Sequence, residues 1–217
     1  MGFFLKLYSC YLFDADGTLF DTTELICQCY LNTAKVAGKA GLTRESILRT
    51  IGLTLRDQMD VHFGPLTQEQ FEYLRGVHMD YQLSIYKKYI KLCKGVFEAL
   101  KRITERGGRC VVVTSRMRPS LETYLKDTGI FSFFQYFITP EETRRHKPDP
   151  QPAQRALELL RCSAEDSLFI GDSTFDIECG HSAGTATAFV NWSLNDRGTL
   201  KVAPTYYLND MRDLCID

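Results

Sequence analysis

The sequence lacks several features that would mark particular classes of protein. Its 26 basic and 27 acidic residues leave a formal charge of −1, which gives no support to a nucleic acid or a membrane surface as the main partner. No apolar stretch approaches the roughly 20 residues of a membrane span. The chain has no internal repeat or low-complexity tract, and its four histidines show no zinc-ligand spacing. These absences favour a soluble globular protein.

The eight cysteines form no C-x-x-C pair and are scattered through the 217 residues. Several fall inside apolar runs, where a thiol acts as a small hydrophobic side chain. The even number admits disulfides, but a chain of this length does not need them for stability. We therefore expect reduced cysteines and a cytoplasmic protein.

What is present is a chain of ordinary globular composition, with 44% apolar and 24% charged residues. An apolar run at 7–13 ends abruptly in Asp14 and Asp16, followed by Gly17 and Thr18. Continuous apolar character suits a strand buried on both faces of a parallel sheet. Ligands bind at the carboxyl ends of such strands, so the two acids are expected to lie in a catalytic loop.

The rest of the chain divides into a helical block and an alternating region. Between about 22 and 92 the pattern is helical, with no buried strand, and Asp21 is expected to cap the first helix. From 94 onward strands and helices alternate. This predicts an α/β fold: a doubly wound parallel sheet, Rossmann-like, formed by 1–20 and 94–217, with an inserted all-helical cap domain at 21–93.

Three further polar clusters follow predicted strands of the alternating region. They are T-S-R at 114–116, H-K-P-D-P at 146–150 and G-D-S-T-F-D at 171–176. Because the carboxyl ends of parallel strands point the same way, these clusters should converge with the two acids of the first strand on one cleft.

The chemistry of these side chains suits phosphoryl transfer. Asp14 and Asp172 are hard oxygen ligands of the kind that Mg²⁺ prefers. Lys147 and the metal could neutralise a phosphoryl group, while the Thr114 hydroxyl and loop amides hold its oxygens. A carboxylate within reach could attack phosphorus in line, and a second acid could protonate the leaving oxygen.

Taken in order, D-A-D-G-T, V-V-V-T-S, H-K-P-D-P and G-D-S-T-F-D resemble the four motifs of the haloacid dehalogenase-like hydrolase superfamily. The helical block lies where that superfamily inserts its cap, so the resemblance covers essentially the whole chain. The I-G-L-T-L-R-D turn and the G-D-S-x-x-D form are most similar to the phosphoglycolate phosphatase-like branch with a helical cap.

The resemblance implies a role for each matching residue. Asp14 would be the nucleophile that forms an aspartyl-phosphate, and Asp16 the general acid and later the base. Thr114 would bind the transferring phosphoryl group, and Lys147 would stabilise its charge and that of Asp14. The dehalogenases of the superfamily resemble D-x-Y-G-T at this motif, with a tyrosine where this chain has the second acid, Asp16. The resemblance therefore favours phosphoester hydrolysis over dehalogenation.

The resemblance also implies a metal site. Asp14, the backbone carbonyl of Asp16 and Asp172 would hold Mg²⁺, and Asp176 would support the metal site or the lysine. Ala15 departs from the bulkier residue common between the two acids.

Residues that recognise the substrate are less clearly indicated. Arg116 could meet a second anionic group on the substrate or be a solvated loop arginine, and Ser115 could contact substrate or start a helix. In the cap, Arg49, Arg56 and the turn at 50–54 resemble the region that relatives lay over the substrate, although helix-surface arginines are common.

The resulting expectation is a Mg²⁺-dependent phosphatase acting on a small phosphorylated metabolite, with no nucleic-acid or membrane partner. Phosphoglycolate, a sugar phosphate, a nucleotide and pyrophosphate all remain open as substrates. A phosphoglucomutase-like isomerase that uses the same aspartyl-phosphate is the first alternative, and a non-catalytic binding protein on this fold is the second. The motifs do not separate hydrolase from mutase, and they leave monomer and dimer undetermined.

Overall fold

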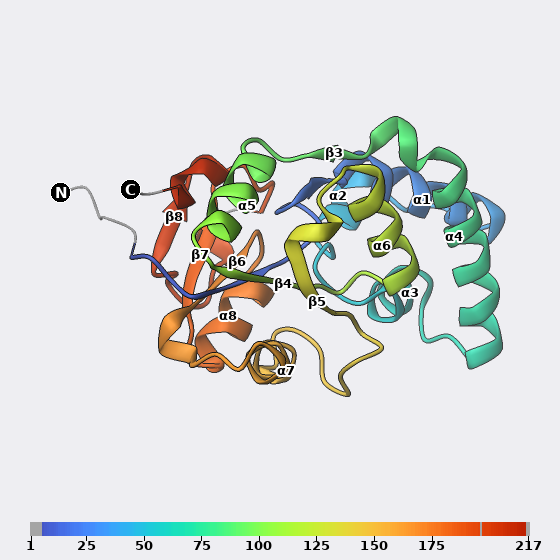
Figure 1. Cartoon of the computed structure of the whole chain (residues 1–217). Helices are drawn as coiled ribbons and strands as arrows, with labels where there is room; N and C mark the ends of the chain where they lie inside the picture. Colours follow the sequence, from blue (N-terminus) through green and yellow to red (C-terminus); the bar gives the residue numbers. More distant parts are fainter. Residues whose placement is uncertain (1–5, 196, 216–217) are drawn as a thin grey trace.

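The centre of the molecule is a six-stranded sheet, seen in a computed structural model that describes residues 6–195 and 197–215 (Figure 1). Every neighbouring pair of strands is parallel. The spatial order is β5 (Phe134–Ile138), β4 (Arg109–Val113), β1 (Cys10–Phe13), β6 (Ser167–Gly171), β7 (Ala186–Val190) and β8 (Tyr206–Leu208). The predicted α/β fold with a Rossmann-like parallel sheet is confirmed.

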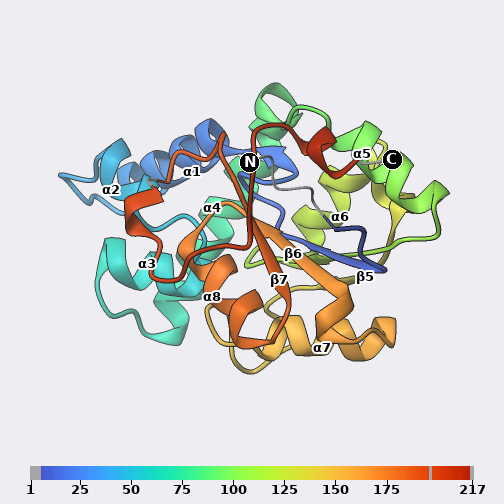
Figure 2. The ribbon, with the colours of Figure 1, turned by 90° about the vertical axis from the view of Figure 1, so that its left-hand side faces the viewer.

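Helices cover both faces of this sheet (Figures 1 and 2). The side chains of β1 alternate between two apolar clusters, with Phe13 on one face and Leu12 on the other, and both are fully buried. This burial on two sides is why the first strand is apolar at every position. The covering helices are α5 (Val96–Glu105) and α6 (Arg118–Asp127) on one face, and α7 (Gln151–Leu160) and α8 (Thr174–Ser182) on the other.

Four helices lie between β1 and α5 in the chain and gather at one end of the sheet (Figure 1). They share an apolar cluster that includes Tyr30, Ile47 and Met59. Two short strands flank this helical segment in the chain and pair antiparallel: β2 (Phe20–Asp21) precedes the four helices and β3 (Lys91–Leu92) follows them. The helices are α1 (Thr23–Val36), α2 (Arg44–Leu48), α3 (Leu55–Phe63) and α4 (Gln68–Tyr89).

The exact division into core (1–20 and 94–217) and cap (21–93) stays a prediction, and its residues 1–5, 196 and 216–217 lie outside the described part. Short 3-10 helices at Phe131–Phe133, Ala164–Asp166, Arg197–Thr199 and Met211–Leu214 complete the described elements. Among the described helices, none is both long and apolar enough to cross a bilayer.

Threonine side chains start three of the cap helices. Thr43, Thr54 and Thr67 each accept a hydrogen bond from the backbone N–H three residues on, which satisfies one of the free donors of the first turn. The start of α1 differs from the expectation. Asp21 does not cap it, because Asp21 ends β2 and Thr22 occupies the capping position without a side-chain bond to the helix.

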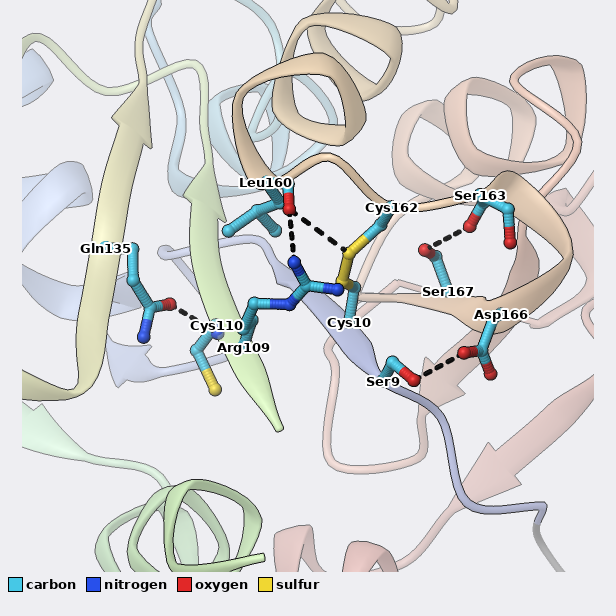
Figure 3. The surroundings of a disulfide bond; sticks show 10 residues. All are labelled: Ser9, Cys10, Arg109, Cys110, Gln135, Leu160, Cys162, Ser163, Asp166 and Ser167. Atoms are coloured by element: carbon cyan, nitrogen blue, oxygen red, sulfur yellow. Dashed lines mark hydrogen bonds between the residues drawn. A yellow bond between two sulfur atoms is a disulfide. The ribbon is translucent and has the colours of Figure 1, made fainter. Parts of the chain in front are cut away.

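A disulfide joins Cys10 in β1 to Cys162, which follows α7 (Figure 3). The expectation that every cysteine is reduced is therefore wrong for this pair. The two residues are 152 positions apart, but the pairing of β1 with β6 brings their Cα atoms to 6.6 Å. Spacing in the sequence could not show this contact. The other six cysteines are free, and all but Cys215 are buried.

The central place of β1 predicts a stability difference between two leucines. Leu12→Ala should lower the free energy of unfolding by about 2–5 kcal/mol, because it leaves a cavity between the sheet and α7. Leu83→Ala is the matched control: this side chain on α4 is 52% exposed, so its loss should cost under about 0.5 kcal/mol. Urea denaturation measures both, and equal losses would contradict the buried position of β1.

Candidate active site

The ends of three adjacent strands bring three predicted site residues together. Asp14, Thr114 and Asp172 each follow the last residue of their strand, namely β1, β4 and β6. Phe13 lies opposite Val112 on one side and Ile170 on the other, so the strands end almost level. All three side chains are buried. Thr114 and Asp172, each a hundred or more positions after Asp14 in the chain, therefore share one edge of the sheet with it.

Lys147 connects two of the acids at this edge. Its Nζ donates to Asp14 Oδ1 and to Asp176 Oδ1, both at 2.6 Å. Burial alone would lower the pKa of Lys147, but these two carboxylates raise it above its ordinary value. Asp176 is oriented by the start of α8, where its Oδ2 accepts from the backbone N–H and the hydroxyl of Ser173. Lys147 is therefore a fixed positive charge beside Asp14.

Three buried carboxylates form a cluster with the composition of a cation site. Oxygens of Asp14, Asp172 and Asp176 lie within 4.8 Å of one another. Burial, together with the neighbouring Asp176, raises the pKa of Asp14 to about 7 and that of Asp172 well above its ordinary value. With all three ionised and only Lys147 opposing them, two negative charges remain. A divalent cation would balance that charge, so the residues fit such an ion.

The backbone at Gly17 approaches Asp172 closely. A Cβ atom there would lie 2.2 Å from Asp172 Oδ2, and the φ of Gly17 is +79°, so only glycine fits. The loop after β7 adds further support: Ser193 Oγ donates to Asp172 Oδ2 at 3.2 Å, and Asn195 Nδ2 does so at 3.3 Å. Trp192 donates its indole N–H to the Gly17 carbonyl at 3.0 Å.

Sequence reasoning did not single out Ser193 and Asn195. Their position did carry a signal, because both follow the carboxyl end of β7, the next strand of the same parallel sheet. No recognisable motif marks them, so only this positional rule could have found them.

Asp16 lies beside the acid cluster but has a different partner. Arg116 donates to both of its oxygens, from Nη2 at 2.6 Å and from Nε at 2.9 Å. The guanidinium is buried against the ring of Tyr124, 4.7 Å from its centroid. The Thr22 hydroxyl also donates to Asp16, at 2.6 Å. Asp14 is thus paired with Lys147 and Asp16 with Arg116, which separates the two acids electrostatically.

A small cavity of about 60 Å³ lies against these acids. The core supplies Asp14, Asp16 and Thr114, and the cap closes the opposite side with side chains from α1, the turn at 50–54, α3 and α4. Ser115 Oγ donates to the Gly52 carbonyl at 2.7 Å, which ties the cap turn to the end of β4. The cap therefore covers the site, and solvent reaches only 5% of Asp14.

Arg49 and Arg56 are not among the residues that line this cavity. Arg49 is exposed and forms an ion pair with Glu45, while Arg56 bonds Asp60 and the Leu66 carbonyl inside the cap. The turn between them does meet the cavity. The two arginines bond to other residues of the cap and do not reach the cavity. A motif match in the sequence cannot distinguish these arginines from ones that contact the substrate.

A family model described as haloacid dehalogenase-like hydrolase matches residues 11–190. The chain belongs to the haloacid dehalogenase-like hydrolases. This hydrolase is 32% identical over 210 residues to a protein named pyrophosphatase PpaX from Bacillus velezensis, covering 96% of this chain and 95% of the relative.

Solved structures have the same fold as the hydrolase. One from Bacteroides fragilis, assigned as a haloacid dehalogenase-like hydrolase, has a TM-score of 0.85 and 27% identity, covering 94% of this chain and 97% of the other. A predicted phosphoglycolate phosphatase from Haemophilus somnus has a TM-score of 0.83 over 95% of this chain and 96% of its own. At 22% identity, the second shows likeness of fold alone.

The raised pKa of Asp14 predicts how the stability of the metal-free hydrolase depends on pH. Asp14 stays protonated up to about pH 7 in the folded chain but ionises near 3.8 when unfolded. The folded state therefore binds more protons in this range, and the free energy of unfolding should fall as pH rises through it, on the order of a few kcal/mol. Asp172 acts in the same direction.

Urea denaturation in EDTA at several pH values measures this dependence. Asp14→Asn removes the titrating group and should make the decline shallower. Asp80→Asn, at an exposed position on α4, is the matched control and should keep the wild-type decline. An unchanged pH dependence in Asp14→Asn would contradict the assignment of the buried proton to Asp14.

Proposed function

We propose that the hydrolase is a Mg²⁺-dependent phosphatase that hydrolyses a small phosphorylated metabolite through an aspartyl-phosphate on Asp14. One observation carries the proposal: Asp14 and a second acid, Asp16, face the same cavity beneath the cap but have different buried cationic partners, Lys147 and Arg116. A nucleophile and a proton carrier need this kind of separation.

The positions of the side chains suggest how the reaction proceeds. Lys147 bonds Oδ1 of Asp14, so Oδ2 is the oxygen available to attack phosphorus. Asp16 would give a proton to the leaving oxygen and later take one from water. The Thr114 hydroxyl and Lys147 would hold the phosphoryl oxygens, and the cap would exclude bulk water.

The metal belongs to the same proposal. Asp14 and Asp172 would hold Mg²⁺ together with the Asp16 backbone carbonyl, and Asp176 would keep Lys147 in place. When bound, Mg²⁺ would neutralise charge on the phosphoryl oxygens. We place the reaction in the cytoplasm, where phosphorylated metabolites are held.

Pyrophosphate is a second candidate substrate, beside phosphomonoesters such as phosphoglycolate. The observation that favours it is the 32% identity to the Bacillus velezensis protein named pyrophosphatase PpaX, over nearly the full length of both chains. Both substrates would transfer a phosphoryl group to Asp14 and differ only in the leaving group.

The nucleophile is tested by Asp14→Asn in the full chain. This variant should reduce phosphate release from a panel of phosphomonoesters and pyrophosphate by at least about 10³-fold, because an amide cannot form the phosphoryl enzyme. Asp127→Asn on α6, outside the cavity, is the matched control and should retain activity. Circular dichroism verifies folding, and full activity in folded Asp14→Asn would sink the proposal.

Metal dependence is tested with the wild-type protein. EDTA should abolish phosphate release and added Mg²⁺ should restore it, because the acid cluster carries excess negative charge without a cation. Turnover that persists in EDTA would count against the metal. Sugar phosphates interconverted without phosphate release would favour the isomerase, and failure on every substrate with Mg²⁺ present would favour the binding protein.

A further inference from the structure

Arg116 is the one charged basic residue among the described residues that line the cavity. His78 lines it as well, but burial and the nearby Arg116 lower the pKa of His78 to about 3, so its imidazole is neutral. Lys147 is engaged on the other side by Asp14 and Asp176. A negative group on the leaving side of a substrate would therefore find its only counter-charge at Arg116.

The guanidinium retains hydrogen-bonding capacity beyond its ion pair. Nε and one N–H of Nη2 are directed at Asp16, and Nη1 makes one contact of 3.3 Å with Ser120 Oγ. A guanidinium has more N–H donors than these, and a donor on each of Nη1 and Nη2 remains. Arg116 can bind an anion without releasing Asp16.

Two buried polar groups of the cap line the same cavity without a partner. The Tyr30 hydroxyl, a possible donor, and Gln82 Oε1, an acceptor, make no hydrogen bond, although these residues are only 1% and 3% exposed. Leaving a buried polar group unpaired costs about 1–3 kcal/mol, so buried polar groups usually have a hydrogen-bond partner. Burial raises the pKa of Tyr30 far above its ordinary value, which keeps its hydroxyl a donor. An anionic group on a ligand would accept from the Tyr30 hydroxyl, whereas Gln82 Oε1 would need a donor, such as a hydroxyl on the same ligand.

The size of the cavity limits this ligand. Its volume is about 60 Å³, and the same cavity has to receive the phosphoryl group beside Asp14 and Thr114. Ile26, Leu55 and Met79 form part of the apolar wall and offer no polar contact to a sugar. A compact leaving group fits, whereas a hexose would require the cap to move away.

We propose that Arg116 and Tyr30 form a subsite for a compact, negatively charged leaving group. The hydrolase then selects substrates that carry a second anionic group, carboxylate or phosphate, next to the scissile bond. This inference rests on the proposed function, because the subsite receives the part of the substrate that departs from Asp14. Arg116 binds that anion beside Asp16, which places the leaving oxygen next to the proton carrier.

The wild-type protein provides the first test, with two substrates: phosphoglycolate, and 2-hydroxyethyl phosphate, in which a neutral hydroxymethyl group replaces the carboxylate. With Mg²⁺ present, kcat/KM should be about ten- to a hundredfold higher for phosphoglycolate, the range of a hydrogen bond to a charged group. Pyrophosphate, measured in parallel, distinguishes a phosphate anion from a carboxylate as the better occupant. Equal values for the charged and uncharged substrates would overturn the subsite.

Variants locate the selectivity. Arg116→Met should bring the ratio of the two kcat/KM values close to one, and Arg116→Lys should restore part of it because the charge returns without the planar guanidinium. Tyr30→Phe removes a hydroxyl that has no partner in the fold, so it should fold normally and lower the ratio several-fold. Tyr11→Phe is the matched control: Tyr11 is a buried tyrosine outside the cavity, and its removal should leave the ratio unchanged.

The outcomes separate the two proposals. Hydrolysis of both substrates with a ratio that Tyr30→Phe and Arg116→Met do not alter would overturn the subsite and leave the phosphatase intact. Phosphate release from other members of the phosphomonoester panel, but from neither of these substrates nor pyrophosphate, would overturn the subsite alone. Phosphate release from no member of the panel would overturn the proposed function itself. Where Arg116→Met fails to fold, the wild-type ratio and Tyr30→Phe decide the question.

Discussion

The ammonium group of Lys147 bonds two carboxyl groups from different elements of the core, Asp14 after strand β1 and Asp176 in helix α8. A buried lysine is stable there because both carboxyl groups lie within hydrogen-bond distance of its ammonium group, since an unpaired charge would be costly in the interior. The level ends of the central strands and the capping bonds of Ser173 provide that placement. The fold of the core thus positions two carboxyl groups around one buried positive charge, that of Lys147.

Features that depend on local pattern could be predicted from the sequence. The apolar run before Asp14 identified a strand buried on two faces, and alternation after 94 identified the parallel sheet. The rule that parallel strands end at one edge then brought Asp14, Thr114 and Asp172 together, as the structure does. These inferences succeeded because burial leaves a regular trace in residue type.

Features that depend on contacts between distant segments could not be predicted. Arg116 gave no sign in the sequence that it would be buried against Tyr124 and paired with Asp16. Nor did the spacing of Cys10 and Cys162, or the position of Arg56 in the cap, show which side chains they would meet. Each of these contacts is decided by how helices and strands pack, and residue type alone is compatible with several arrangements.

The turn at 50–54 of the cap is in direct contact with the core beside the candidate active site. A Cβ at Gly52 would lie 2.9 Å from the ring of Phe175, and its carbonyl already accepts from Ser115, so the backbone of the turn touches the core. Any side chain at position 52 would hold the cap away from the sheet and admit solvent. Access of water to the cavity beside Asp14 therefore depends on one backbone position of the cap that is far from Asp14 in sequence.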